Sequence, residues 1–576
     1  MRFSPIVSML QRSVESPGAC ASVRPTQTSA HPDYVAWPLA AALIKGSAMS
    51  SVTATFDYII VGAGPAGCAT AARLAIARPD STVLLLETGP AKSGVLSDLP
   101  LGVAGLVPFQ NPRNYSYRTV PQPGLGGRRG VQPRGRGVGG SSLINAMIYM
   151  RGQHEDYDDW ANAGATGWSW RDVFPYFLRA ENNERGASDW HATGGPLNVA
   201  DLASPSECAC LFVKAAEQCG HPLNPDFNGA TQEGVGQYQV FQKQGSRYNA
   251  ARAYIGGLAP KNLTVIATTQ VERVLIEQGR ATGIRCVDGK MFVARAEVVL
   301  SAGAFGTPQL LMMSGIGPAD HLRAMGIDVL HDSPEVGGNL QDHLDFTICR
   351  AINDRELLGI VPSVIPQVIR AIKPYKSGTG MLTSNVAEAG GFLKTRKELD
   401  RPDIQLHLCI GIVDNHNRKM HMTRGLSLHV CNLRPESRGV VRLASNDIRK
   451  APMIDPGYLS HPGDLDTLLA GVRIAQDILA APAFARYAGK TYYNADSTDE
   501  NLLRQSIRDH ADTIYHPVGT CRMGSDANAP IDPQLRVRGV SHLRVADASI
   551  MPSLISGNTQ APSAMIGERA ADFIAG

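Results

Sequence analysis

The sequence predicts an α/β fold that combines a parallel sheet with a second, α+β domain. The first sign is a short apolar run at 57–61 that ends in glycine, as a buried parallel strand does. An alanine-rich helical run at 65–78 stops at Pro79, and a second buried strand at 82–86 stops at Glu87. Strand, helix and strand within about thirty residues form a βαβ unit, whose crossover is almost always right-handed.

Later segments extend this sheet and divide the chain. Apolar runs at 297–301 and 543–547 have the character of further strands of the same sheet, which makes the first domain discontinuous. Between them, 264–267, 270–277, 283–287 and 291–295 alternate like a small antiparallel meander. From 321 to 504, strands and helices mix without a glycine-rich phosphate loop. We therefore assign 54–320 and 505–576 to a nucleotide-binding domain and 321–504 to a substrate-binding domain.

Composition limits the classes of function. The 576 residues include 55 Lys and Arg against 52 Asp and Glu, and a formal charge of +3 argues against a nucleic-acid partner held by net charge. Hydrophobic residues make up 43% and charged residues 19%, which is typical of globular chains. At roughly 100 to 200 residues per domain, the length allows two or more domains.

The spacing of the cysteines and the length of the apolar runs indicate the cellular compartment of the protein. The ten cysteines form no CxxC pair, and the one-residue gap between Cys208 and Cys210 suits neither zinc nor a disulfide. We therefore predict no metal site and a reduced, cytoplasmic setting. No apolar run approaches the roughly 20 residues of a membrane span; the nearest, 34–44, is interrupted by Pro38. Peripheral contact with an inner membrane is the alternative to a purely cytoplasmic location.

Residues 1–53 are assigned to an N-terminal extension that is disordered or not native. The segment up to residue 48 is basic and rich in Ser and Pro, as a transit peptide would be, but Glu15, Asp33 and its prolines disfavour one good amphipathic helix. A natural start at Met49 is the other interpretation, because the first strand follows a few residues later. In that case residues 1–48 are dispensable for folding and activity.

Gly62, Gly64 and Gly67 form a GxGxxG motif in the context that a dinucleotide site requires, with a strand before it and a helix after it. Gly62 allows the tight turn, Gly64 lets the backbone approach a pyrophosphate, and Gly67 permits close packing of helix and strand. The helix N-terminus then faces the phosphate charge. Glu87 follows Gly67 by about 20 residues, where a carboxylate can bond a ribose hydroxyl. The motif fits NAD and FAD equally well.

Further segments decide between the two cofactors. They are the glycine- and serine-rich stretch 135–145, the stretch 303–317 with an expected loop at 303–308 leading into a short helix, and the C-terminal stretches 515–524, 545–547 and 557–562. In these motifs the sequence resembles the glucose–methanol–choline (GMC) family of FAD-dependent oxidoreductases, from residue 54 to 576. Its FAD-binding domain, of the p-hydroxybenzoate-hydroxylase type, is then expected here. In 383–392 and 515–519 the chain is most similar to acceptor-linked aliphatic alcohol dehydrogenases and bacterial choline dehydrogenases.

The resemblance implies an active-site pair and a mode of cofactor attachment. His516 is the expected catalytic base and Asn558 its partner, although this chain has Gln560 where family members commonly have a second Asn. Some members hold FAD covalently through a histidine in the Gly-Gly-Ser-Ser block. Ile144 occupies that position here, so we expect non-covalent FAD.

The resemblance also assigns the remaining cofactor contacts. Asp547 is expected near the ribityl chain or the pyrophosphate, and Val271 is expected to present its backbone to the adenine. Val138 and Asn145 are expected along the cofactor near the flavin ring. A helix starting near Pro562 would direct its positive end toward the charge that reduced flavin gathers.

The implied reaction is oxidation of a primary, aliphatic alcohol to the aldehyde, with hydride passing to flavin N5 and the electrons then to a quinone-type acceptor rather than NAD. An alcohol gives up its hydride readily only as its hydroxyl proton leaves, and histidine, with an ordinary pKa near 6.5, is suited to take that proton. The apolar stretch 357–372 favours either a path for an apolar substrate or a membrane-facing patch near quinone.

Several alternatives stay open at this stage. A choline dehydrogenase would need an aromatic cage or a carboxylate for the cationic headgroup, and Glu388 could supply the carboxylate. An oxygen-using alcohol oxidase, a lyase of the hydroxynitrile type and a flavoprotein without catalysis are less favoured, the last two because the His516 and Asn558 pair is complete. Among weaker candidates, 339–343 is expected to be packing near the cofactor. His407 and Cys409 are expected on one face of a strand, lining a core or pocket.

Overall fold

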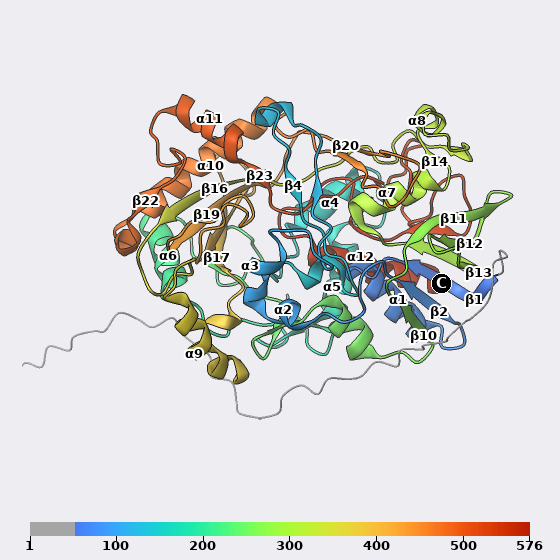
Figure 1. The fold of residues 1–576 in the computed structure, drawn as a ribbon, viewed down its shortest axis with the longest axis horizontal. Coiled ribbons are helices and arrows are strands. Elements are labelled where there is room, and N and C mark those ends of the chain that lie inside the picture. The colour runs from blue at the N-terminus through green and yellow to red at the C-terminus, as the bar shows by residue number, and fades with distance from the viewer. Residues whose placement is uncertain (1–51) are drawn as a thin grey trace, which may run out of the picture. The chain divides into compact units, whose positions relative to one another are not determined.

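The first sheet grows from buried apolar strands, as the sequence predicts. The computed structural model describes residues 52–576, and the predictions for 1–51, including a start at Met49, lie outside the described residues. β1 (Val52–Val61) pairs in parallel with β2 (Val83–Leu86) on one side and with β13 (Met291–Leu300) on the other (Figure 1). β24 (Leu543–Val545) pairs in parallel with β13, so the C-terminal segment completes the sheet. The α/β class and the βαβ unit are confirmed.

Two details of this sheet correct the prediction from sequence. β10 (Leu263–Ile266) is not part of the antiparallel meander but pairs in parallel with β2 at the opposite edge. The meander consists of β11 (Val271–Glu277), β12 (Arg280–Cys286) and β13, and β13 unites two runs that the sequence separates. Local alternation does not specify the partner strand, and the pairing of β10 is set by where the chain returns to the sheet.

β1 also begins earlier than the sequence indicates. Val52 and Thr53, assigned to the extension, are part of the strand, and Val52 lies opposite Met291 of β13. Pairing with β13 extends the strand over residues that carry no strong strand signal of their own. The expected loop at 303–308 is likewise wrong, because α7 (Gly303–Met313) is helical from its first residue.

Small residues let two helices pack closely against this sheet. α1 (Pro65–Ala77) starts with proline at its first position, a preferred place for it, and buries most of its alanines together with Gly67 and Cys68. α12 (Gln560–Ala575) packs against α1 and against α5 (Trp170–Ala180). A Cβ atom at Gly567 would stand 2.3 Å from the carbonyl oxygen of Ala66, so glycine is required where α1 and α12 cross.

The second sheet is mostly antiparallel and almost wholly buried. Its strand order is β22 (Lys490–Thr491), β16 (Leu344–Ala351), β19 (Gly425–Asn432), β18 (Ile404–Cys409), β17 (Ala387–Leu393) and β7 (Gly234–Gln237), and β23 (Asp512–Thr513) pairs with β16. α10 (Pro462–Ala480) packs on this sheet, with α6 (Glu207–Gln218) and α11 (Glu500–His510) beside it (Figure 1). β7 and β23 come from outside 321–504, and the described residues fall in one compact unit, so the proposed domain boundaries stay predictions.

The remaining helices and two-stranded ribbons are outside the two main sheets. The helices are α2 (Val95–Asp98), α3 (Val103–Leu106), α4 (His154–Asn162), α8 (Ala319–Ala324) and α9 (Val364–Lys376). The two-stranded ribbons are β3 (Tyr117–Arg118) with β4 (Val131–Gln132), β5 (Glu181–Asn183) with β6 (Leu197–Val199), β8 (Gln242–Lys243) with β9 (Ser246–Arg247), β14 (Ile316–Gly317) with β15 (His331–Asp332), and β20 (Val440–Arg442) with β21 (Met453–Asp455). Within residues 52–576, every helix is too short or too polar to cross a bilayer.

Candidate active site

A cavity of about 760 Å³ joins the two sheets. One end is lined by residues at the carboxyl ends of β1, β2 and β13, where ligands bind in open parallel sheets. The other end is lined by β17, β18 and β19 of the second sheet. This volume lies in the range of small-molecule and cofactor sites, about 300 to 1,000 Å³.

The glycines of the GxGxxG motif have three different surroundings. Gly62 has φ +104°, and a Cβ atom there would lie 2.4 Å from the carbonyl oxygen of Ser301, so only glycine fits the turn. Gly64 lines the cavity, and a Cβ atom there would meet no atom within 4 Å. Gly67 does not line the cavity but packs against the turn, where a Cβ atom would lie 1.9 Å from the carbonyl oxygen of Gly62. The first N–H groups of α1 have no partner within the helix and lie beside the cavity.

Glu87 holds three backbone segments together beside this turn. Its Oε1 accepts the N–H groups of Gly89 at 2.7 Å and Gly137 at 3.0 Å, and its Oε2 accepts that of Ala63 at 3.1 Å. Burial raises the pKa of Glu87, while the three N–H donors act in the opposite direction. A carboxylate has about four acceptor positions, so one remains for a hydroxyl in the cavity.

The structure brings three more of the predicted cofactor residues to the cavity. Asn145 and Val271 line it, and Asn145 Oδ1 accepts from Arg247 Nη1 at 2.8 Å. Asp547 lines it as well, with its carboxylate accepting the N–H of Gly303 and the hydroxyl of Thr307. Val138 is not brought there: its side chain is buried in the core next to the loop. Sequence proximity to the glycine-rich block did not reveal that this side chain turns inward.

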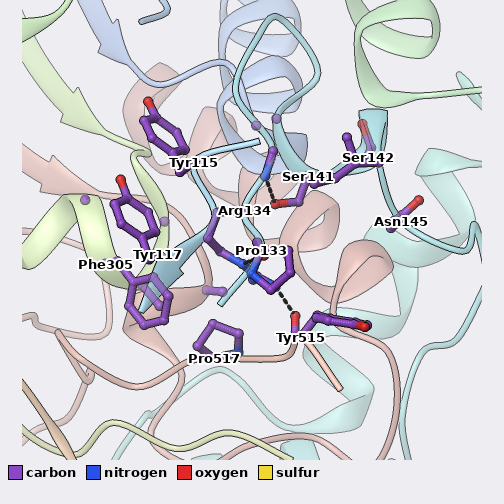
Figure 2. A pocket seen from close by; sticks show the side chains of 18 of the residues that line it. Tyr115, Tyr117, Pro133, Arg134, Ser141, Ser142, Asn145, Phe305, Tyr515 and Pro517 are labelled. Carbon is purple, nitrogen blue, oxygen red and sulfur yellow. Dashed lines mark hydrogen bonds between the residues drawn. The ribbon is translucent and has the colours of Figure 1, made fainter. Parts of the chain in front are cut away.

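An aromatic wall runs along one side of the cavity (Figure 2). The rings of Tyr115 and Tyr117 are stacked at 5.0 Å between centroids, and Phe305 of α7 meets Tyr117 edge-on at 5.9 Å. In Figure 2, Ser141, Ser142 and Asn145 lie across the pocket from these rings, and Tyr515 lies near its floor. No motif in the sequence indicated Tyr115 and Tyr117.

His516 and Asn558 meet at the junction of the two ends of the cavity. Asn558 Nδ2 lies 3.2 Å from His516 Nε2, and its Oδ1 accepts from Gln405 Nε2 at 3.1 Å. The backbone N–H of His516 donates to Asp342 Oδ1 at 2.9 Å, and Tyr515 before it has φ +77°, an uncommon conformation for an aromatic residue. The pair predicted from sequence is therefore in contact and lines the cavity.

A second histidine, His343, determines which ring nitrogen of His516 is unprotonated. His343 Nε2 lies 3.0 Å from the carbonyl oxygen of Leu433, which can only accept, so Nε2 carries the proton. Burial lowers the pKa of His343 to about 3, so the ring is neutral and its Nδ1 is an acceptor. His516 Nδ1 lies 3.0 Å from that atom and must donate to it. The lone pair of His516 is therefore on Nε2, beside Asn558.

The protonation state of His516 agrees with this chain of hydrogen bonds. Burial lowers the pKa of His516 well below its usual value, and neighbouring His343, His407 and Arg134 lower it further. The ring is neutral at physiological pH and can accept a proton at Nε2. The sequence placed His343 in a packing segment, and only its contact with His516 distinguishes it from an ordinary buried histidine.

The end of the cavity beyond His516 is mainly apolar. Its lining includes Ile148, Val386, Ala387, Val413 and Ile514. His407 and Cys409 of β18 both line it, as expected from their alternation. Within 52–576, no group of His, Cys, Asp or Glu side chains has the arrangement of a metal site.

Glu388 does not take the role that a cationic substrate would require. Its carboxylate accepts from the N–H of Ser206 at 2.8 Å and from Ser384 Oγ at 2.6 Å, and it does not line the cavity. The hydrogen bonds of Glu388 thus tie β17 to the start of α6. Glu388 lies at a β-bulge between Ala387 and Ala389 of β17 and does not line the cavity, whereas its neighbour Ala387 does.

Comparisons with known proteins agree on one family. The GMC oxidoreductase models match residues 56–345 and 435–567. The chain is 44% identical over 528 residues to an alcohol dehydrogenase [acceptor] of Pseudomonas putida, covering 90% of this chain and 95% of that protein. It is 40% identical over 543 residues to the mitochondrial choline dehydrogenase of Homo sapiens, covering 92% and 91%. A variant of the formate oxidase of Aspergillus oryzae, solved in work on FAD modification, has a TM-score of 0.83 at 26% identity, covering 91% and 98%.

Proposed function

Because the chain belongs to the GMC oxidoreductase family, we propose that it is an FAD-dependent alcohol dehydrogenase that oxidises a primary, aliphatic alcohol to the aldehyde. The observation that carries the proposal is the contact of His516 Nε2 with Asn558, in a cavity continuous with the GxGxxG turn; the hydrogen bonds through His343 imply that this nitrogen is unprotonated. A quinone-type acceptor, rather than NAD, completes the proposed reaction.

The residues of the cavity fit FAD. The positive end of α1 and the open space at Gly64 suit a pyrophosphate, and Glu87 retains an acceptor position for a ribose hydroxyl. Gln560 Nε2, at the start of α12, is a buried donor to which no protein group bonds, and Gln560 lines the cavity. Ile144 also lines it and offers no nucleophile, which supports non-covalent attachment.

His516 and Asn558 have separate roles in the proposed reaction. FAD, when bound, supplies the hydride acceptor at flavin N5. His516 receives the hydroxyl proton of the alcohol at Nε2, and His343 holds the ring in the tautomer that can do so. Asn558 Nδ2 orients the hydroxyl oxygen without adding charge. His516 is buried and Asn558 is half-buried, which limits the access of bulk water and strengthens both hydrogen bonds.

The lining of the cavity favours a neutral alcohol over choline. The carboxylates that line it among the described residues are Glu87 and Asp547, and both are engaged near the GxGxxG turn. Glu388 faces away. The similarity to choline dehydrogenases keeps choline as the second candidate, and it must be tested directly.

The exposed face of α9 supports contact with a membrane surface, where a quinone would be met. Ile365, Ile369 and Ile372 recur on this helix at the spacing of one face and are 65%, 62% and 47% exposed. Arg370, Lys373 and Lys376 on the same helix are exposed cations that would complement acidic headgroups.

Sedimentation with vesicles tests the α9 surface. Replacing Ile365 and Ile369 with Ser should reduce binding to vesicles that contain acidic phospholipid, because each exposed isoleucine contributes on the order of 2 kcal/mol when its side chain enters the interface. Leu502→Ser, at an exposed leucine on α11, is the matched control and should bind like the native protein. Equal binding by all three proteins, or no binding by the native protein, would refute the membrane contact.

Anaerobic mixing tests the proposed reaction. The FAD-loaded protein is mixed with 1-pentanol, choline or buffer, and the flavin absorbance is followed. Bleaching by 1-pentanol supports an alcohol dehydrogenase, and bleaching by choline alone supports the second candidate. Absence of bleaching with any alcohol would leave a non-redox enzyme of the lyase type or a flavin-binding protein. Reoxidation by a soluble quinone faster than by oxygen would separate a dehydrogenase from an oxidase.

A further inference from the structure

Two histidines lie opposite each other on neighbouring strands in the part of the cavity that the second sheet lines. His407 of β18 lies directly opposite His429 of β19 in the sheet register, and their rings are 6.4 Å apart. Both line the cavity and both are buried, at 3% and 5% exposure. Neither ring nitrogen of His407 nor His429 Nε2 has a hydrogen bond of good geometry to a protein group, although Asn558 lies near His407 and Cys409 lies near His429. These nitrogens lie among a mixed lining that includes the apolar Val386 and Val413 and the polar Asn385, His416 and Asn417.

The protonation state of His429 is determined by Asp345, a residue outside the cavity. Asp345 of β16 does not line the cavity, and its Oδ2 lies 2.6 Å from His429 Nδ1 and accepts from Thr347 Oγ1 at 3.1 Å. Burial acts to lower the pKa of His429, but the charge of Asp345 outweighs it and the pKa lies well above its usual value. His429 is thus an imidazolium placed between the carboxylate and the cavity, with Nε2–H as its remaining donor.

His407, in contrast to His429, is neutral. Burial, reinforced by the neighbouring charge of His429, lowers the pKa of His407 to about 3, so its ring is neutral and presents one N–H donor and one acceptor. The wall therefore offers a charged donor and a neutral donor side by side. A saturated hydrocarbon chain would desolvate both without replacing their hydrogen bonds.

We propose that His407 and His429 form a polar subsite for a hydrogen-bond acceptor carried by the alcohol substrate, an ether, carbonyl or carboxylate oxygen a few carbon atoms from the reacting hydroxyl. Asp345 balances the charge of His429 from outside the cavity, so the pair is neutral overall but presents its imidazolium edge to the cavity, which disfavours alcohols with a quaternary ammonium group. This inference rests on the proposed function, since it names the substrate class of the same site.

Matched pairs of alcohols test the subsite in the native holoenzyme. 3-Methoxypropan-1-ol and 2-ethoxyethanol have the shape of 1-pentanol with one CH₂ replaced by an ether oxygen, and 3,3-dimethylbutan-1-ol is the neutral counterpart of choline. We expect kcat/KM for flavin reduction to be at least tenfold higher for at least one of the two ethers than for 1-pentanol. A site built to hydrogen-bond disfavours an analogue that lacks the acceptor group. We expect it to be at least tenfold higher for 3,3-dimethylbutan-1-ol than for choline.

Two variants assign these preferences to the histidine–aspartate pair. His429→Ala exposes Asp345 to the cavity. The ratio of kcat/KM for the preferred ether to that for 1-pentanol should therefore fall toward one, and kcat/KM for choline should rise relative to that for 3,3-dimethylbutan-1-ol. Asp345→Asn combined with His429→Gln keeps a neutral hydrogen-bonded pair, protects the fold if the single variant is unstable, and should relieve the rejection of choline. His421→Gln is the matched control, because His421 forms the same 2.6 Å contact with Asp414 away from the cavity and should keep native ratios.

The outcomes separate this inference from the proposed function. Flavin reduction by 1-pentanol with no preference for either ether, or native ratios in both His429 variants, would overturn the subsite and leave the dehydrogenase intact. Choline preferred over 3,3-dimethylbutan-1-ol in the native enzyme would also overturn it. No flavin reduction by any of these alcohols would overturn the proposed function and the subsite with it.

Discussion

At the residue scale, the position of one proton decides whether His516 can act as a base. The carbonyl of Leu433 fixes the tautomer of His343, and His343 in turn fixes the tautomer of His516. Nε2 of His516 is then unprotonated without any carboxylate in contact with the ring. A neutral partner has a physical advantage here, because a carboxylate against His516 would raise its pKa and keep it protonated.

The His516→Ala variant should retain FAD, because the GxGxxG turn is separate from His516. It should lower the rate of flavin reduction by roughly 10²- to 10⁴-fold, the usual contribution of a positioned general base. Asn558→Ala removes orientation rather than the base and should cost about tenfold. Stopped-flow reduction by 1-pentanol measures both. A native rate in His516→Ala would show that another group takes the proton.

We propose that His343 positions His516 through its acceptor atom Nδ1. His343→Leu removes the partner of His516 Nδ1, lets the other tautomer compete, and should lower flavin reduction roughly 10- to 100-fold. His343→Gln keeps an acceptor at that place and should recover much of the loss. If Gln and Leu are equally slow at full FAD content, His343 does not act through the tautomer of His516.

Titration of His343 also has a thermodynamic consequence. Its folded pKa is about 3 against roughly 6.5 unfolded, so below pH 6.5 the unfolded chain binds a proton that the folded chain excludes. Native stability must fall as pH drops from 6.5 toward 3. His343→Leu lacks this term, so its stability deficit relative to the native protein should shrink by up to about 1.4 kcal/mol per pH unit. Urea unfolding at pH 7, 6 and 5 measures the deficit, and a constant value would contradict the assignment.

At the element scale, Asp547 joins the end of β24 to the start of α7. One carboxylate oxygen accepts the N–H of Ser549 at 2.8 Å, and the other accepts the N–H of Gly303 at 2.8 Å and the hydroxyl of Thr307 at 2.6 Å. Two segments more than 200 residues apart in the chain are thus held at the cavity wall. The carboxylate of Asp547, which the sequence assigned to FAD binding, therefore also has a structural role.

Asp547→Ala should lower both stability and FAD content. It leaves two backbone N–H groups and a hydroxyl without a partner, which costs about 2 to 5 kcal/mol. Asp499→Ala is the control: Asp499 caps α11 on the surface, so this change should cost about 1 kcal/mol and leave the flavin content native. Denaturant unfolding and the flavin-to-protein ratio are the measurements. A native flavin content in Asp547→Ala would argue against a cofactor role for Asp547.

At the scale of the whole molecule, we propose that the cofactor is held between the two sheets without a covalent link. Ile144 lines the cavity where a covalent link would need a nucleophile. Acid precipitation of the holoenzyme should therefore release the flavin into the supernatant, and the intact mass of the polypeptide should be that of the unmodified chain. Flavin that stays with the precipitate would refute non-covalent attachment. Added FAD should also raise the thermal midpoint of the apoprotein, because a ligand that binds only the folded state stabilises it.

The sequence by itself determined the parts of this protein that local constraints specify. The turn at Gly62, the helix from Pro65 and the strand ending before Glu87 follow from backbone geometry and apolar patterning within about thirty residues. The assignment of His516 and Asn558 as a pair came from family resemblance, and the structure places the two side chains in contact.

Only the tertiary structure decided which side chains face one another across the sheets. The partners of His516 and His429 come from β16 and its preceding segment, more than eighty residues away in each case, and a shift of one residue in strand register would turn every side chain to the opposite face. Contacts with distant segments likewise decided that Glu388, at a β-bulge of β17, turned away from the cavity, that Val138, in a turn, packed into the core, and that β10 paired with β2. Side-chain facing depends on pairing between distant segments, and no local pattern records it.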